Sequence, residues 1–355
     1  MTRQVVARIL LAMLVGAACG EQHRPLDRYF HIRPEGAEEA LGWVAHRFSS
    51  DSGAVCWAGG VFKVFFRDAP PWAPNTDEAM VFLDGGGACW NDLTCSQGGA
   101  VRESHLPYPS GILDLDVDGV QPALAALPTV FIPSCDGSLF AGDHDVDYLR
   151  AGRVRHHGLQ NLSAGIMVLK ARMPGLRRIL LVGMSAGGYG ALVALEVLHR
   201  AFPDAEVVTV VDSGPGVMNP LNPLLRRELT EAWRIDENIP EYCTNCDIHL
   251  TPLMAAAFAR HPLLVRGGFI SGHSDVVMEV FTGLSPVVYG GVVRDQVARV
   301  KHAHPGRVHA FLHGQQLHGA LIRPEFHTLA IDGVTLEQWV LQAWRGDAQW
   351  TSRME

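Results

Sequence analysis

The chain of 355 residues predicts an α/β fold with a mostly parallel sheet and helices on both faces. Short apolar runs rich in Val, Ile, Leu and Phe, typical of buried strands, alternate with segments of helical character. Glycine and polar residues repeatedly follow these runs, at the strand ends where ligands collect in parallel sheets. The alternation predicts one layered sheet, and the polar strand ends predict one site on it.

The expected elements follow one another without an internal repeat, a low-complexity tract or an interdomain linker. We therefore expect a single domain over residues 55–355, preceded by a polar N-terminal arm at residues 19–54. Strands are expected at 61–66, 80–83, 129–133, 179–182, 206–211, 264–270 and 307–312, and helices at about 159–172, 191–198, 287–300 and 336–344.

A glycine-flanked serine connects one predicted strand to the next predicted helix, where the chain reads Gly183-Met184-Ser185-Ala186-Gly187. This G-x-S-x-G pattern is typical of a nucleophile elbow, in which the serine hydroxyl stands clear of the sheet. Glycines lack a Cβ, so the backbone can close sharply, and the helix N-terminus aims N–H groups at a developing oxyanion. The pattern predicts Ser185 as the nucleophile of an α/β-hydrolase-like fold. A plain glycine turn is the alternative until an acid, a base and an oxyanion site are found.

A second glycine-rich stretch, DGGG at residues 84–87, follows the strand predicted at 80–83. Consecutive glycines after a strand let backbone N–H groups turn toward a bound carbonyl oxygen. We expect Gly86, Gly87 and Ala186 to supply the donors of an oxyanion hole. The alternative is a tight turn held by a nearby disulfide.

The acid of such a site should lie between the nucleophile and the base in chain order. Asp212, Asp275 and Asp295 meet this condition. Asp212 follows the strand next after the nucleophile, where a structural cap or loop anchor is the alternative role. Asp275 follows one strand later, where the usual acid loop lies, so we expect Asp275 to be the acid.

The base should lie on the loop after the last strand. Two of the seventeen histidines in the chain, His313 and His318, lie at the end of this strand or on the loop. His313 stands in or at the end of that strand. His318 stands on the loop, where its ring is free to reach Ser185. Loop placement and chain order therefore favour His318, and His313 is the alternative.

Composition and net charge argue against a disordered chain and against nucleic-acid binding. With 48% hydrophobic and 19% charged residues, the chain can bury a large core and has no disordered character. The formal net charge is −8, and no dense run of Lys and Arg is present to neutralise phosphates. We expect no nucleic-acid partner.

The first residues have the three parts of an export signal. Arg3 and Arg8 precede an apolar core at residues 9–15, and small residues follow before Cys19. Cleavage of residues 1–18 would leave Cys19 first in the mature chain, as in a lipoprotein, with ordinary secretion as the alternative. We expect a protein that is secreted, periplasmic or lipid-anchored at the cell envelope through Cys19.

Six cysteines remain besides Cys19, and an even number in an oxidising compartment indicates disulfides. Cys243 and Cys246 offer a zinc site as an alternative, but no second C-x-x-C or closely spaced Cys/His pair accompanies them. Cysteines close together in the sequence are the natural partners, which gives Cys89–Cys95 and Cys243–Cys246. The two cysteines that remain give the third expected disulfide, Cys56–Cys135.

Three motifs in this order resemble those of the pectin acetylesterase and Notum family. They are FLDGGGACWN at residues 82–91, CDGSLFAGD at 135–143 and GMSAGGYG at 183–190, and the resemblance covers most of residues 55–345. It implies a serine carboxylic-ester hydrolase of the α/β-hydrolase type, without a metal or organic cofactor.

The resemblance also implies roles for single residues. It carries the nucleophile onto Ser185, the acid onto Asp275 and the base onto His318, and the Cys56–Cys135 pairing is similar to one that the family uses. Asp84 and Ala88 depart from the family, which often has Glu and Trp there. The small Ala88 leaves more room on the acyl side.

The resemblance implies a substrate in the form of an acetylated polysaccharide or another small ester. Longer acyl esters, as in the Notum branch, are the alternative within the enzyme class. A non-catalytic carbohydrate-binding protein on a hydrolase scaffold is the alternative outside it.

Overall fold

The computed structural model describes residues 24–74, 76–246 and 248–355. The expected signal segment, residues 1–18, and the expected lipid-attachment residue Cys19 lie outside these residues. Ten strands form one sheet, in the order β1-β2-β3-β5-β4-β8-β9-β10-β11-β14. Their bounds are β1 Gly36–Ala40, β2 Trp43–Phe48, β3 Phe62–Arg67, β5 Thr129–Ile132, β4 Glu78–Leu83, β8 Arg178–Met184, β9 Glu206–Asp212, β10 Leu264–Gly272, β11 Val308–His313 and β14 Arg353–Met354.

The sheet is mostly parallel, as the alternation of strands and helices predicts. All pairs from β5 through β4, β8, β9, β10 and β11 to β14 are parallel, whereas β1, β2 and β3 join antiparallel at one edge. Parallel strands point their carboxyl ends to the same edge, so the loops after β4, β8, β9, β10 and β11 gather there.

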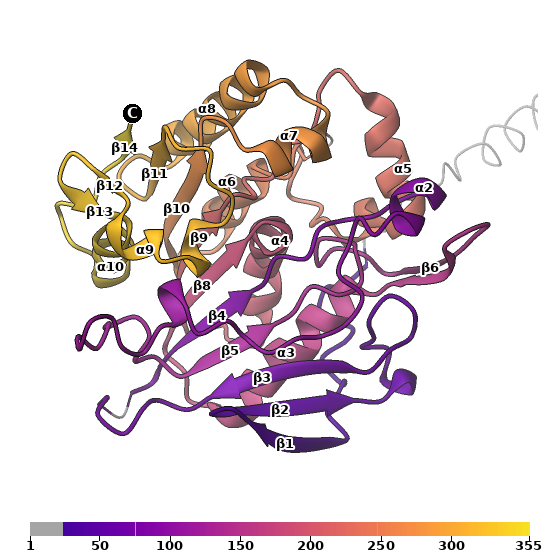
Figure 1. The fold of residues 1–355 in the computed structure, drawn as a ribbon, viewed down its shortest axis with the longest axis horizontal. Helices are drawn as coiled ribbons and strands as arrows, with labels where there is room; N and C mark the ends of the chain where they lie inside the picture. Colours follow the sequence, from indigo (N-terminus) through magenta and orange to yellow (C-terminus); the bar gives the residue numbers. More distant parts are fainter. Residues whose placement is uncertain (1–23, 75, 247) are drawn as a thin grey trace, which may run out of the picture.

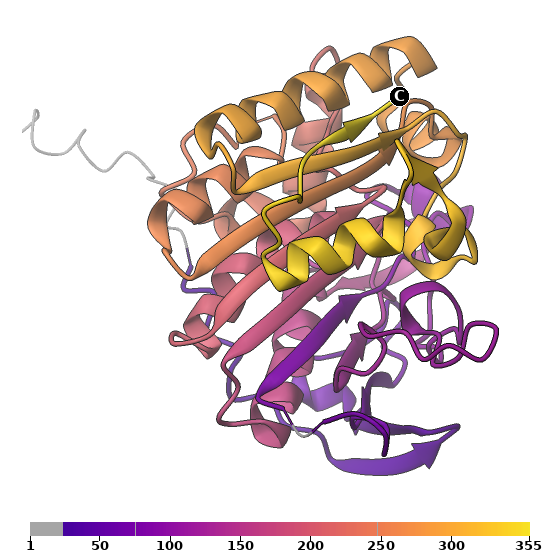
Figure 2. The same cartoon turned by 90° about the vertical axis from the view of Figure 1, so that its left-hand side faces the viewer.

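Helices cover both faces of the sheet (Figures 1 and 2). Alternate residues of β8 show this: Ile179 and Leu181 face one hydrophobic core, and Leu180 and Val182 face the other. The first core receives α3 Gly158–Arg172, α4 Ala186–Ala201, α6 Pro252–Arg260 and α8 Pro286–Ala303. The second receives α9 Glu325–Thr328 and α10 Leu336–Arg345, the yellow helix in Figure 2.

The sheet starts earlier in the chain than the sequence indicates. Strands β1 and β2 fall within the expected N-terminal arm at residues 19–54, yet they pair with each other and with β3. Strand β1 is an edge strand with the sequence Gly-Ala-Glu-Glu-Ala and exposed central residues. Charged, solvent-facing edge strands lack the apolar run that marks a buried strand, so the sequence pattern does not reveal β1.

Several shorter elements lie at or near the carboxyl edge of the sheet. Helices α2 Asp92–Ser96, α5 Pro223–Trp233 and α7 Val276–Thr282 contribute residues to one common cavity.

No single helix among the described residues is long and apolar enough to cross a membrane; α7 and α8 pass that test only as a pair bent by 88°. The remaining strands are β6 His144–Tyr148, β7 Gly152–His156, β12 Ala330–Ile331 and β13 Val334–Thr335. Short 3-10 helices lie at Ser50–Ser52, Gly111–Leu113, Ile235–Asn238 and Ala320–Ile322.

Candidate active site

Ser185 occupies the sharp turn between β8 and α4. Its backbone has φ 56° and ψ −118°, a conformation that residues with a Cβ rarely adopt. Such strain costs on the order of 1–3 kcal/mol and persists where the surrounding structure over-determines it. Here the Ser185 N–H donates to Asp212 O at 2.9 Å, and Ser185 O accepts from the Gly188 N–H at 2.9 Å. The elbow is therefore held from both sides.

The two glycines of the elbow have no room for a side chain. A Cβ at position 183 would lie 2.0 Å from Gly187 O, and a Cβ at position 187 would lie 2.0 Å from Leu83 O. These contacts bring the first turn of α4 against both β8 and the end of β4. The G-x-S-x-G spacing is thus a steric requirement of this turn.

Asp275 and His318 meet at the same edge of the sheet, from the loops after β10 and β11. His318 Nδ1 lies 2.8 Å from Asp275 Oδ2 and 2.9 Å from Oδ1. The carboxylate is fully buried, and the imidazole is one-fifth exposed. A carboxylate can only accept here, so the ring proton belongs on Nδ1 and Nε2 keeps its lone pair.

The loop that carries His318 lies beside the serine elbow. A Cβ at Gly319 would lie 2.8 Å from Sδ of Met184, the residue before Ser185. Arg323 Nε donates to His318 O at 3.0 Å and supports the loop from the other side. The structure forms no hydrogen bond between Ser185 and His318, and among the described residues neither Ser185 Oγ nor His318 Nε2 has another partner. Both atoms are available to a bound ester, and catalytic hydrogen bonds often tighten only when substrate binds.

Asp212, an alternative acid in the sequence, anchors this loop. Asp212 Oδ1 accepts from the Ser213 hydroxyl at 2.9 Å, and Oδ2 accepts from the Leu321 N–H at 2.8 Å. The Ser213 hydroxyl oxygen in turn accepts from the Gly319 N–H at 2.9 Å. Burial raises the pKa of Asp212 to about 6. Both of its oxygens hold the loop, and among the described residues neither forms a hydrogen bond with an imidazole.

Among the described residues, the other two alternatives form no hydrogen bond with Asp275 or His318. Asp295 is on α8, where it pairs with Arg299 at 2.9 Å on the surface. His313 is fully buried in β11, and burial lowers the pKa of its ring.

The loop after β4 places free N–H groups beside the serine. A Cβ at Gly85 would lie 3.2 Å from Ser185 Cβ, and Gly87 has φ 72°. Among the described residues, no hydrogen bond occupies the backbone N–H of Gly86, Gly87 or Ala186. The three N–H groups expected to form an oxyanion hole are therefore unpaired.

His105 is a residue of this region that sequence reasoning missed. Its Nε2 lies 2.9 Å from Oδ2 of Asp84, the buried residue that starts the glycine loop. Burial raises the pKa of Asp84, and the hydrogen bond with Asp84 raises the pKa of His105. His105 belongs to an irregular segment with no periodic pattern, so no sequence signal could have found the pair.

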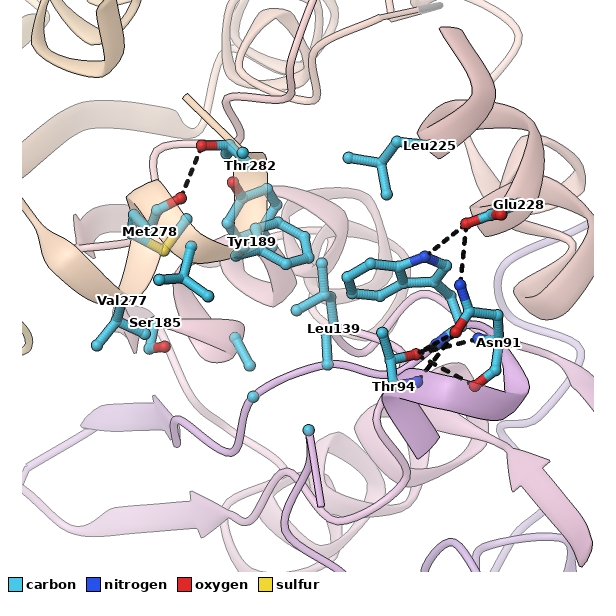
Figure 3. A pocket seen from close by; sticks show the side chains of 18 of the residues that line it. Asn91, Thr94, Leu139, Ser185, Tyr189, Leu225, Glu228, Val277, Met278 and Thr282 are labelled. Atoms are coloured by element: carbon cyan, nitrogen blue, oxygen red, sulfur yellow. Dashed lines mark hydrogen bonds between the residues drawn. The ribbon is translucent and has the colours of Figure 1, made fainter. Parts of the chain in front are cut away.

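A cavity of about 600 Å³ extends from Ser185 between α2, α5 and α7. In Figure 3, Ser185 and Val277 lie at one end and Glu228 at the other. Glu228 accepts hydrogen bonds from Trp90 Nε1 at 2.8 Å and Asn91 Nδ2 at 3.2 Å, which leaves the indole ring facing the cavity. The apolar lining consists of Ala88, Trp90, Leu139, Ala186, Tyr189, Leu225, Val277, Met278, Val280 and Phe281.

Three disulfides join the cysteines of the described chain in the pairs that the sequence indicates. They are Cys56–Cys135, Cys89–Cys95 and Cys243–Cys246. The bond between Cys243 and Cys246 removes the thiolates that a zinc site there would need. Within the described residues, the one group with metal-ligand geometry is Cys89, Cys95 and His156, and its two sulfurs are also joined to each other.

The parallel sheet, the strained serine after β8 and the Asp–His pair after later strands define a protein of the α/β-hydrolase class. Residues 41–244, more than half of the chain, match the Pectinacetylesterase family model. The chain belongs to the pectinacetylesterase family, and the resemblance seen in the sequence motifs is confirmed.

Two curated relatives come from Arabidopsis thaliana. Pectin acetylesterase 4 is 26% identical over 211 residues, which are 55% of this chain and 50% of that protein. Pectin acetylesterase 5 is 24% identical over 211 residues, 55% of this chain and 48% of that protein. The chain thus spans about half the length of the curated relatives it matches.

Among solved structures, the Wnt deacylase Notum from Drosophila superposes with a TM-score of 0.64 and 18% sequence identity. The match covers 89% of this chain and 97% of that chain. At this identity the likeness shows a common fold.

Proposed function

We propose that the protein is an exported serine esterase that hydrolyses carboxylic esters at Ser185. The observation that carries the proposal is the 2.8 Å contact between His318 Nδ1 and the buried carboxylate of Asp275. The loop of His318 lies beside Ser185, whose backbone is strained and whose hydroxyl has no partner among the described residues. Membership of the pectinacetylesterase family supports the same reaction class.

In the proposed reaction, His318 Nε2 takes the proton from Ser185 Oγ as the hydroxyl attacks the ester carbonyl carbon. Asp275 holds the ring proton on Nδ1 and stabilises the imidazolium. The N–H groups of Gly86, Gly87 and Ala186 stabilise the oxyanion; losing one such donor typically costs roughly 3 kcal/mol of barrier. The alkoxide leaves with the proton from His318, and water then hydrolyses the acyl-enzyme by the same route.

A Ser185→Ala variant tests the proposal. It should fold as wild type by circular dichroism and should lose hydrolysis of p-nitrophenyl acetate and labelling by a fluorophosphonate probe. Undiminished turnover in the variant would remove the elbow from the mechanism. A wild-type protein that binds oligosaccharides but resists the probe would favour the carbohydrate-binding alternative.

Acetyl esters of a polysaccharide are the first substrate candidate. Family membership and the names of the two Arabidopsis relatives support this candidate. The net charge of −8 disfavours a strongly anionic polymer, because like charges repel.

Esters of longer acyl chains are the second candidate, and the cavity is the observation that favours them. An acetyl group has one methyl carbon, whereas the cavity beside Ser185 holds about 600 Å³ and has a largely apolar lining. Each CH₂ buried there would contribute about 0.8 kcal/mol to binding. A series of p-nitrophenyl esters from acetyl to palmitoyl separates the candidates. A maximum of kcat/KM at acetyl supports the first, and a maximum at octanoyl or longer supports the second.

Export is supported by the three disulfides, because such bonds persist in oxidising compartments. The proposed signal peptide is residues 1–18, with Cys19 first in the mature chain. Intact-mass measurement of the mature protein tests both the cleavage site and a membrane tether through acylated Cys19.

A further inference from the structure

Helix α7 presents apolar side chains to solvent. Of its seven residues only Met278 and Thr282 are buried, whereas Val276, Val277 and Val280 are 57%, 49% and 79% exposed. A surface helix of a soluble protein normally turns such side chains inward. The orientation of α7 therefore needs a reason other than core packing.

The same kind of side chain continues across the cavity on two other segments. Leu93 on α2 is 53% exposed. Leu221, before the start of α5, is 84% exposed, and Leu224, in the first turn of α5, is 57% exposed. Their chain neighbours, including Thr94, Asn222 and Leu225, line the cavity itself. We call these exposed aliphatic residues the apolar rim; it consists of Leu93, Leu221, Leu224, Val276, Val277 and Val280.

The carboxylate of α7 is held by local hydrogen bonds. Glu279, its one charged residue, accepts from the Ser274 hydroxyl at 2.8 Å and from the Asp275 N–H at 3.0 Å. These hydrogen bonds hold the carboxylate beside the start of the helix.

The charged side chains of α5 likewise have partners within the protein. Glu228 holds Trp90, Arg227 lies 3.6 Å from Glu231, and Arg226 pairs with Asp236. With a net charge of −8 on the whole chain, the rim offers little electrostatic attraction to an anionic surface.

The apolar rim adjoins the proposed catalytic residues. Asp275 Oδ1 accepts from the Met278 N–H at 3.1 Å, so the proposed catalytic acid is also the N-cap of α7. Val277 and Val280 belong to the rim and also line the cavity that reaches Ser185. An apolar chain entering across the rim would meet apolar side chains along its path to the nucleophile.

We propose that the apolar rim docks the protein on the surface of an uncharged ester-lipid assembly, from which an acyl chain enters the cavity. Aliphatic side chains have no donor or acceptor for sugar hydroxyls, and contiguous exposed apolar surface marks an interaction site. The net charge of −8 favours a neutral surface over an anionic one. This inference rests on the proposed esterase function and deepens its second substrate candidate.

Docking is tested without catalysis by flotation of the protein with phosphatidylcholine vesicles. The Ser185→Ala chain is used in a Cys19→Ser background, so that neither turnover nor lipidation contributes. It should float with the vesicles, and adding Leu224→Ser and Val280→Ser should reduce the recovered fraction at least about fivefold, because two aliphatic side chains no longer bury apolar surface in the lipid. The matched control is Leu41→Ser, which removes an aliphatic side chain that is 89% exposed on the β1–β2 turn, outside the rim.

The coupling of docking to hydrolysis is tested with an active Ser185 and tributyrin. The rate should rise as the ester passes its solubility limit, and Leu224→Ser with Val280→Ser should lower the emulsion-to-monomer rate ratio about tenfold. The proposal is overturned if the unmutated rim does not float, or if Leu41→Ser loses as much as the rim variant. Absence of hydrolysis with every soluble ester would instead overturn the proposed function, while flotation would still report on the rim.

Discussion

An Asp275→Asn substitution probes the proposed acid without removing its cap on α7. Both oxygens of Asp275 lie within 2.9 Å of His318 Nδ1, and Oδ1 also accepts from the Met278 N–H. If the asparagine oxygen keeps the helix cap, its NH₂ group faces Nδ1. The ring must then accept at Nδ1 and carry its proton on Nε2, where it cannot take the proton of Ser185.

We expect kcat to fall about 10⁴-fold, the loss typical of a wrong histidine tautomer in such a triad. This loss corresponds to roughly 5.5 kcal/mol of transition-state stabilisation. Stability should change little, because the capping oxygen remains. Asp275→Ala should lose the cap as well, at a further cost of about 1 kcal/mol in the free energy of unfolding.

The assay compares kcat for p-nitrophenyl acetate with urea unfolding of the same preparations. The matched control is Asp295→Asn, which changes an exposed aspartate on α8 and should leave kcat unchanged. If Asp275→Asn retains kcat within tenfold of wild type, or if Asp295→Asn falls as far, the assignment of the acid is wrong.

Three further predictions concern groups around the site. His105→Ala leaves the buried Asp84 carboxylate without its partner, so we expect a loss of about 1–3 kcal/mol in urea unfolding together with a lower kcat. Burial raises the pKa of Asp136 to about 6 from 3.8, so its contribution to the free energy of unfolding is present below pH 4 and is lost as the pH rises through 6. Asp136→Asn should remove up to about 3 kcal/mol of that decline, measured as melting temperature against pH. Replacing Cys56 and Cys135, which are 79 residues apart, with Ser should cost roughly 4–5 kcal/mol in urea unfolding.

Each of these predictions has an outcome that contradicts it. Unchanged stability and kcat in His105→Ala would show that Asp84 needs no partner. A pH dependence identical to wild type in Asp136→Asn would place the titration elsewhere. A loss below about 1 kcal/mol on removing the long-range disulfide would mean that the unfolded chain is already constrained.

The elbow could be predicted from sequence because its requirements are local. Gly183, Ser185 and Gly187 lie within five positions, and the steric limits that demand glycine act between neighbouring backbone segments. Buried parallel strands were also predictable, since a strand covered on both faces must be a continuous apolar run. Strand β1 is exposed to solvent at the edge of the sheet, so its residues need not be apolar and the sequence pattern did not predict it.

The choice between Asp275 and Asp212 shows where sequence reasoning reaches its limit. Both aspartates follow a strand at the same edge of the sheet. In the structure, Ser213 and the Leu321 N–H occupy the oxygens of Asp212, and Asp275 meets an imidazole 43 residues away in sequence. Chain order admitted both aspartates, and the strand that Asp275 follows favoured it, but only the packing of the loops gave each carboxylate its partner.

By itself the sequence determined the fold class, the family, the strained serine turn and the local cysteine pairs, because these depend on periodicity and on contacts between near neighbours. Tertiary structure alone decided the Asp84–His105 pair, the anchoring role of Asp212, and the cavity and apolar rim formed by α2, α5 and α7. These features bring together segments that are not neighbours in the sequence, and Asp212 and Leu321 are 109 residues apart. No local sequence pattern specifies which of these segments come into contact.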